Sequence, residues 1–156
     1  MRDLRDRALI VTLTYSFARI TAALKMKVED LRPRRAGWSI RLHEKGEKHH
    51  TMPCYHSLAE ALHAYINCAG IAEDRKGWLF RTARGHNGKA LSQNPMTQPD
   101  AWRMIRRRAA APGIVEAIGC HTFRGNRDYR LSLEWGRPRA RARNGRTREP
   151  AHYQAL

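Results

Sequence analysis

The sequence predicts an α+β fold that is mostly helical, in which a small antiparallel β-hairpin packs against a helical bundle and a basic C-terminal tail is disordered. Three observations predict it. Apolar residues recur at helical spacing in several segments, and the spacing changes to every second residue from Trp38. Residues 125–156 are rich in arginine and have no apolar period. The length of 156 residues fits one domain with a single modest core.

Two helices are predicted at the N-terminus. Residues 3–15 carry an apolar stripe formed by Leu9, Ile10 and Leu13. Arg5 and Asp6 are expected on the other side of this helix. A second, short helix is predicted from about Arg19 to Met26, with inward residues Ile20, Ala23 and Leu24. Arg19 stands at the junction, where a charged group can face a cleft, although a solvated arginine at a helix start is the commoner case.

A β-hairpin is predicted next. Apolar and polar residues alternate from Trp38 to His43, which is typical of a half-buried strand. Residues 44–47 supply the turn, and residues 48–52 form the return strand, which Pro53 closes. Lys45 therefore lies at the tip of the hairpin, a place where a lysine often does no more than aid solubility.

Two further helices are predicted beyond the hairpin. Ser57 and Glu60 have capping-box spacing and open a helix that runs to about Gly70. Residues 73–96 hold three glycines and are predicted to form a loop with one short apolar anchor at residues 78–80. The next helix begins near Thr97, and its inward residues are Ala101, Met104 and Ile105. An arginine run at residues 106–108 lies toward its end, where it suits either the helix dipole or a DNA-facing role.

An imidazole and a guanidinium stand three residues apart after a break at Pro112 and Gly113. On a helix, His121 and Arg124 would share one face and could reach one ligand. Arginine offers a charged planar fork that suits phosphate, and histidine can move a proton near neutral pH. The pattern His-x-x-Arg is weak by itself and is also typical of a solvated helix start.

The charge of the chain indicates a polyanionic partner. Lysine and arginine number 30 against 14 acidic residues, which gives a formal net charge of +16 and a pI near 11.0. Residues 125–156 hold eight arginines against three acids, so the tail contributes +5 and the rest +11. Nucleic acid is therefore the leading candidate partner. No carboxylate cluster stands beside the basic residues, which disfavours a metal-dependent nuclease.

Neither a structural metal nor a disulfide framework is predicted. The three cysteines are widely spaced and no CxxC occurs: Cys54, Cys68 and Cys120. Four potential ligands cluster near the hairpin, but we interpret them as scattered surface residues: His49, His50, Cys54 and His56. Residues 8–15 are apolar but too short to cross a bilayer, and no signal-peptide cleavage site follows them. We expect a cytoplasmic protein with no membrane partner.

Three of these features stand in an order that resembles the catalytic domain of tyrosine recombinases, the phage integrase family. They are an arginine between two N-terminal helices, a lysine on a β-hairpin, and His-x-x-Arg. The segments that carry the resemblance are Y-S-F-A-R-I at residues 15–20, E-K-G-E-K at 44–48, W-L-F-R-T at 78–82 and C-H-T-F-R at 120–124. The resemblance covers roughly residues 3–124, and the combination is far more specific than any of its parts.

The resemblance implies a reaction and a set of roles. Such enzymes cut DNA by attack of a tyrosine on a backbone phosphate, and they integrate or excise mobile elements. Arg19 and Arg124 would stabilise charge that develops on the phosphoryl oxygens. Lys45 would donate a proton to the leaving 5′-oxygen, and His121 would assist at the same phosphate. The family needs neither a metal nor a nucleotide cofactor, and an intact member would assemble as a homo-oligomer on DNA.

The chain departs from the family pattern after Arg124. Residues 1–124 are expected to form a partial catalytic domain, and residues 125–156 lack the family's A-T-G-I-T-A-Y-L helix and its R-T-T-x-L-Y segment. We hypothesise that one inserted base after the Arg124 codon shifted the reading frame. Read one base later, the codons where Asn126 meets Arg127 permit only Ile or Thr, and those of Trp135 and Gly136 force a glycine.

This copy is therefore expected to lack the tyrosine nucleophile and to be inactive. Tyr153 lies at an attractive distance from His121 in the sequence, but we expect neither Tyr153 nor His152 to be catalytic. A tyrosine hydroxyl is a poor nucleophile unless activating groups hold it. The alternative function is a non-catalytic basic module that binds DNA through its phosphates without sequence preference.

Overall fold

The computed structural model describes residues 1–46, 48–85, 90–110 and 122–125. The helices of this part are α1 (Arg2–Ser16), α2 (Ile20–Leu24), α3 (His56–Ala69), α4 (Gln98–Ala110) and α5 (Thr122–Gly125), with a 3-10 turn η1 (Val28–Asp30). Its strands are β1 (Leu31–Arg34), β2 (Gly37–His43), β3 (His49–Pro53), β4 (Arg81–Arg84) and β5 (Ala90–Pro95). The predicted α+β class is confirmed, while the predicted disordered tail lies outside the described residues from residue 126 onward.

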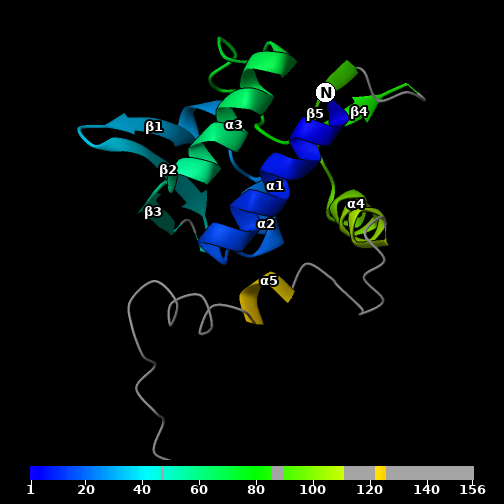
Figure 1. The fold of residues 1–156 in the computed structure, drawn as a ribbon, viewed down its shortest axis with the longest axis horizontal. Helices are drawn as coiled ribbons and strands as arrows, with labels where there is room; N and C mark the ends of the chain where they lie inside the picture. The colour runs from blue at the N-terminus through cyan, green and yellow to red at the C-terminus, as the bar shows by residue number, and fades with distance from the viewer. Residues whose placement is uncertain (47, 86–89, 111–121, 126–156) are drawn as a thin grey trace, which may run out of the picture.

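Helix α1 crosses the middle of the molecule, as Figure 1 shows, and α3 packs against it. The three-stranded sheet, in the order β1-β2-β3, lies to one side of these helices. Helix α4 and the two-stranded sheet β4-β5 lie to the other side. Short α2 contacts α1, β2 and α4, so it joins both sides of the fold.

Both predicted N-terminal helices are present. Leu9 and Leu13 are fully buried, and Ile10 packs partly against the core. Helix α2 buries every residue that was predicted to face inward: Ile20, Ala23 and Leu24. The periodicity of apolar residues predicted these helices because their buried faces are mostly apolar.

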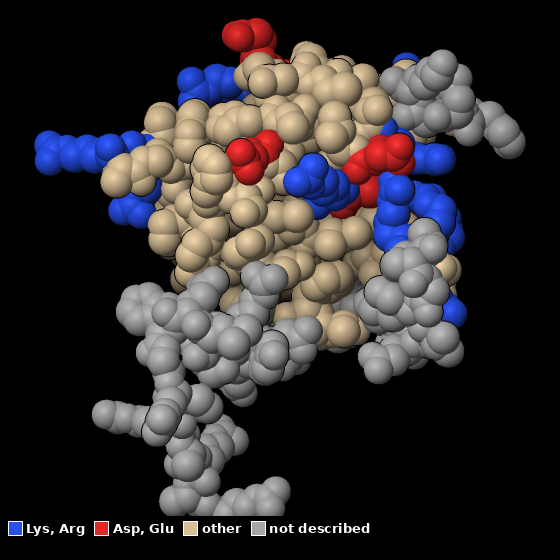
Figure 2. All heavy atoms as spheres, viewed as in Figure 1, with Lys and Arg blue, Asp and Glu red and all other residues tan. Residues whose placement is uncertain are grey.

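The expected position of Arg5 and Asp6, on the side of α1 opposite to the apolar stripe, is wrong. Their exposed fractions are 4% and 0%, because Arg5 lies four residues before Leu9, and Asp6 three, so both share the buried face of α1, where Arg81 and α4 supply their partners. Arg5 Nη2 donates to Asp6 Oδ1 at 2.8 Å, and Arg5 Nη1 donates to the Arg81 carbonyl at 2.8 Å. Buried charges are tolerated when they are paired in this way. Figure 2 shows acidic and basic side chains next to one another over the start of α1 and α4.

The predicted hairpin is confirmed as β2 and β3, which pair antiparallel with Ile40 opposite Met52 and His43 opposite His49. A third strand, β1, pairs antiparallel with β2 and was not predicted. Its sequence hides it, because Pro33 and two arginines interrupt any apolar alternation. A proline is tolerated there because β1 lies at the edge of the sheet.

Two other predictions are corrected by the structure. Residues 73–96 are not a loop, since they contain the antiparallel strands β4 and β5, with Arg81 opposite Pro95. Buried polar residues such as Arg81 and Ser92 masked this sheet in the sequence. Helix α3 begins at His56 after Tyr55, which makes no side-chain cap, so the predicted capping box at Ser57 is also wrong.

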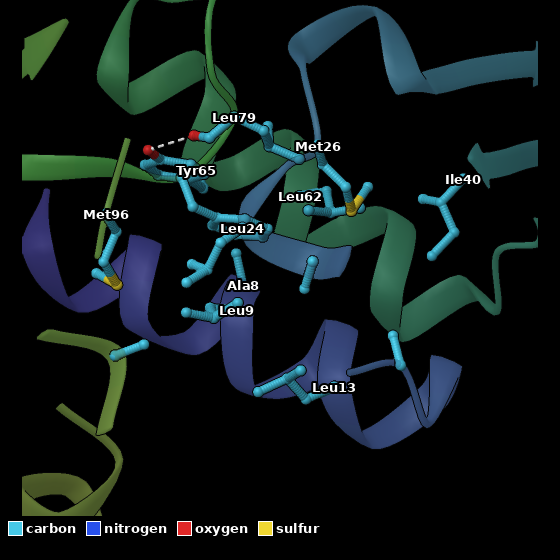
Figure 3. Packing of buried hydrophobic residues seen from close by; sticks show 14 of the residues in the cluster. Ala8, Leu9, Leu13, Leu24, Met26, Ile40, Leu62, Tyr65, Leu79 and Met96 are labelled. Atoms are coloured by element: carbon cyan, nitrogen blue, oxygen red, sulfur yellow. Dashed lines mark hydrogen bonds between the residues drawn. The ribbon is translucent and has the colours of Figure 1, made fainter. Parts of the chain in front are cut away.

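The core lies between α1, α3 and the segment at residues 79–80 (Figure 3). Tyr65 Oη donates to the Leu79 carbonyl at 2.8 Å, and the Tyr65 and Phe80 rings lie parallel with centroids 6.1 Å apart. Burial raises the pKa of Tyr65 to about 12. Helix α4 closes the core with the three residues that were predicted to face inward: Ala101, Met104 and Ile105. Within the described ranges, no helix combines the length and apolarity that crossing a membrane requires.

Candidate functional site

Arg19 projects from the corner between α1 and α2. Helix α1 ends at Phe17, whose left-handed φ of 51° turns the chain and whose N–H donates to the Leu13 carbonyl at 3.1 Å. Ala18 and Ile20 on either side of Arg19 are 4% exposed, which anchors the backbone of the corner. The Arg19 side chain between them is exposed. The fold therefore fixes the backbone of this arginine and leaves its guanidinium available to a ligand.

Lys45 lies in the turn between β2 and β3, as predicted, and is exposed. The Glu44 N–H donates to the Lys48 carbonyl at 2.7 Å and closes the base of this turn. Gly46 has a φ of +76°, a conformation that side-chain-bearing residues adopt at a cost. The turn geometry thus holds Lys45 at the tip of the β2–β3 hairpin.

The buried carboxylate of Asp30 binds two side chains of β2 and so stabilises the hairpin. Asp30 is 0% exposed, and its Oδ1 accepts from Arg41 Nε at 2.7 Å. Its Oδ2 lies 2.7 Å from His43 Nε2 and also accepts from the Lys27 N–H at 2.8 Å. Arg41 and His43 are two residues apart on β2, so their side chains share the face opposite to Ile40 and Leu42. This network ties the end of β2 to η1.

A pocket connects the hairpin to the end of α2. Its lining residues are Lys25, His43, Glu44, Lys45, Gly46 and His49. Lys25 is the residue that ends α2, and Arg19 is the residue that begins it. Arg19 thus lies at the start of α2, and Lys45 lies across the pocket from the end of the same helix. No direct contact joins the two side chains. The sequence missed Lys25, His43 and Asp30; the alternation of Arg41 with His43 was the available signal.

The second predicted box is described in part. His121 lies outside the described residues, as do His152 and Tyr153. Arg124 belongs to α5, but its side chain is also outside the described part of the chain. Helix α5 contacts α1, and Phe123 packs against the core. The backbone that carries Arg124 is therefore docked on the same helix that leads to Arg19.

Electrostatics separate Arg19 and Lys45 from the structural arginines. Arg41 pairs with Asp30, Arg81 with Asp74 at 2.5 Å, and Arg107 with Asp6 at 2.7 Å. Neither the Arg19 nor the Lys45 side chain has a hydrogen bond or ion pair with another described group. No described carboxylate neutralises their charges, so both can interact with an external anion such as phosphate.

A metal site is not assembled near the hairpin. Among the described residues, no three histidine, cysteine or acidic side chains are placed to hold a metal ion. Burial raises the pKa of the Cys54 thiol to about 11, so the thiolate that metals prefer is scarce at neutral pH. His56 is instead paired with Glu60 at 3.1 Å on the surface of α3. The chemistry available here is that of fixed cations and proton donors.

Comparison with known proteins gives consistent matches. The model of the phage integrase family matches residues 1–133, which runs past Arg124. Tyrosine recombinase XerD of Corynebacterium glutamicum is 27% identical over 124 residues, which are 78% of this chain and 38% of that protein.

Two solved structures share the fold. The XerH site-specific recombinase bound to difH substrate in a pre-cleavage complex has a TM-score of 0.61 and 18% identity, covering 85% of this chain and 36% of that one. Its post-cleavage complex with palindromic difH substrate has a TM-score of 0.61 and 21% identity, covering 83% of this chain and 35% of that one. The chain spans little more than a third of the length of these relatives.

Proposed function

The chain belongs to the phage integrase family, and on that premise we propose that it is the catalytic domain of a site-specific tyrosine recombinase. The observation that carries this proposal is the family match over residues 1–133. Two exposed cations at family positions, Arg19 and Lys45, support it because no described carboxylate neutralises them. The inherited reaction is cleavage and rejoining of DNA strands during integration or excision of a mobile element.

Double-stranded DNA is the proposed substrate. The two similar solved structures are recombinases bound to their difH substrates. The net charge of +16 favours binding to a polyanion. Contacts from fixed arginines and lysines to phosphates position the duplex, whereas sequence preference needs base contacts.

Four residues carry the proposed chemistry. Arg19 and Arg124 hold the scissile phosphate, and their interaction strengthens as charge accumulates on its oxygens. Lys45 donates a proton to the leaving 5′-oxygen, and His121 hydrogen-bonds or transfers a proton at the same phosphate. The docking of α5 on α1 supports a shared position for Arg19 and Arg124.

We propose further that this copy lacks the tyrosine nucleophile because its reading frame changes after Arg124. The constraints at Asn126–Arg127 and Trp135–Gly136 support this reading. The inactive copy would retain a phosphate-binding cleft and lose the residue that attacks it. Cleavage would then be absent even though DNA binding persists.

A pair of matched chains tests the proposal. One is the chain as it stands, and the other is encoded by the same gene with one base removed after the Arg124 codon and read onward in the new frame. Each is incubated with nicked suicide duplexes of randomised sequence, and covalent protein–DNA adducts are separated on denaturing gels. We expect adducts from the second chain alone, and we expect Arg19→Ala to abolish them. An adduct from the first chain that disappears on Tyr153→Phe would sink the proposed loss of the nucleophile.

A non-catalytic DNA-binding module is the second candidate, and the basic charge of the whole chain favours it. It predicts that neither chain forms an adduct while both bind duplex DNA with a steep salt dependence. It also predicts that Arg19→Ala weakens binding no more than the loss of any other exposed arginine. The adduct assay and a binding titration therefore separate the two functions.

A further inference from the structure

We propose that Lys25, His43 and His49 form, together with Lys45, a second phosphate subsite that holds a DNA backbone phosphate next to the scissile one. The inference rests on the proposed function, since it takes duplex DNA as the ligand. It assigns a role to the end of α2 and to both strands of the hairpin, beyond the four residues with proposed catalytic roles. Lys45 would then stand between two phosphates of one strand.

The shape of the pocket suits an anion on an extended backbone. The pocket has a volume of about 600 Å³ and is open to solvent. Its walls come from Lys25 at the end of α2, His43 at the end of β2 and His49 at the start of β3. An open hollow can accept a phosphate of a DNA strand that continues on both sides of it, whereas a closed cavity could not.

The charge of the pocket favours a phosphate. Lys25 and Lys45 each bring an ammonium group, and the His49 imidazole can donate a hydrogen bond. Among the lining residues that the structure describes, Glu44 is the one carboxylate. Asp30 lies behind His43 and is already paired with Arg41, so it adds little uncompensated negative charge. Within the described lining, two ammonium groups against one carboxylate favour the binding of an anion.

The imidazoles are held in place before any ligand arrives. His43 Nε2 is bonded to Asp30 Oδ2 at 2.7 Å, which fixes the orientation of the ring; its Nδ1 can donate to a phosphate only in the imidazolium form, which carries a hydrogen on both nitrogens. The His49 ring stands at 88° to the His43 ring, with centroids 4.8 Å apart. A side chain that is already oriented loses little rotamer freedom on binding, so its contact contributes more to affinity.

Opposite substitutions in the same pocket provide the test. The dissociation constant of the full chain for a random-sequence 20-bp duplex is measured across salt concentrations. Lys25→Ala should weaken binding several-fold at low salt and lower the slope of log K against log salt by about 0.9, the value for one lost phosphate contact. Glu44→Gln should tighten binding. Arg35→Ala is the matched control, because Arg35 is exposed in the turn at the opposite end of β2.

The possible results separate the subsite from the function. If the unmodified chain does not bind the duplex, the proposed function fails and the subsite with it. If it binds, but Lys25→Ala and Glu44→Gln both leave affinity and slope at the level of Arg35→Ala, the subsite fails and the function stands. Ring resonances of His43 and His49 give a readout that needs no variant. They should shift when the duplex is added, and unchanged resonances alongside measured binding would overturn the subsite.

Discussion

Asp6 in α1 and Arg107 in α4 are 101 positions apart in the chain, yet Arg107 Nη2 donates to Asp6 Oδ2 at 2.7 Å. The same oxygen accepts from Arg108 Nη2 at 2.9 Å, while Oδ1 accepts from Arg5. One fully buried carboxylate thus joins the first helix of the chain to the helix that precedes the predicted His-x-x-Arg box. The arginine run at residues 106–108, for which the sequence left two roles open, is partly structural.

Asp6→Ala is predicted to destabilise the fold strongly. It leaves the Arg5 guanidinium buried without its carboxylate, and removing one partner of a buried pair costs about 3–5 kcal/mol. The free energy of unfolding in urea measures the effect. Asp3→Ala is the control, since Asp3 also binds Arg108 but is 80% exposed, and it should change stability little. Equal losses of unfolding free energy from the two substitutions would show that the burial of Asp6 does not determine how much its ion pairs stabilise the fold.

The Asp3 contact is predicted to be sensitive to pH and salt. The hydrogen bond from Arg108, helped by its charge, holds the pKa of Asp3 below its ordinary value of 3.8. Because the pKa of Asp3 is lower in the folded than in the unfolded chain, its contact with Arg108 stabilises the fold fully at a pH above the unfolded-state pKa. This stabilisation is lost as the pH falls through the folded-state pKa. The stability difference between the unmodified chain and Asp3→Asn should therefore shrink between pH 7 and pH 3. It should also shrink in high salt at pH 7, and a difference independent of both would contradict the assignment.

Tyr65→Phe is predicted to cost about 1–3 kcal/mol, because it leaves the buried Leu79 carbonyl without the hydroxyl that it accepts from. The ring and its packing on Phe80 are retained, so the loss reports the hydrogen bond. Denaturant unfolding measures it, and an unchanged m-value would show that the unfolded state is the same. A loss near zero would mean that another donor, such as water, replaces the hydroxyl.

Arg19→Ala and Arg81→Ala are predicted to have opposite profiles. Arg81 is 3% exposed and donates to the Trp78 carbonyl, Gln93 and Asp74, so its loss should cost at least about 2 kcal/mol of stability. Arg19 is exposed and has no described partner, so its loss should change stability by less than about 0.5 kcal/mol. Arg19→Ala should instead weaken DNA binding and its salt dependence. Unfolding curves and binding titrations on both variants check the contrast.

The sequence predicted those parts of the fold whose buried faces are apolar. The stripe at Leu9 and Leu13, the alternation from Trp38 and the inward face at Met104 and Ile105 all correspond to buried residues. The strands that were missed bury polar side chains or lie at an edge. In the sequence, Arg81 and Asp6 look like surface residues. Arg81 can be buried because the fold brings Asp74 and Gln93 beside it, and Asp6 can be buried because α4 brings Arg107 beside it.

The residues of the candidate site also divide into those that the sequence identified and those that it did not. Arg19 and Lys45 were found by their likeness to family motifs, and the structure places both on exposed turns. Lys25 was not found, because it becomes a neighbour of Lys45 only when α2 docks beside the hairpin, and His43 was interpreted only as part of the alternation of the strand. Sequence separation hides such neighbours, and only the two-residue spacing of Arg41 and His43 indicated a polar face on β2.

The link from Asp6 to residues 107 and 108 also bears on how the protein emerges from the ribosome. Two of the guanidiniums that neutralise the Asp6 carboxylate are synthesised about a hundred residues after it. Until then, Asp6 can bury itself only against its neighbour Arg5, and the N-terminal helix cannot complete its packing. Contacts of such long range delay native packing during synthesis. The two ends of the described fold are therefore expected to become ordered together, late in translation.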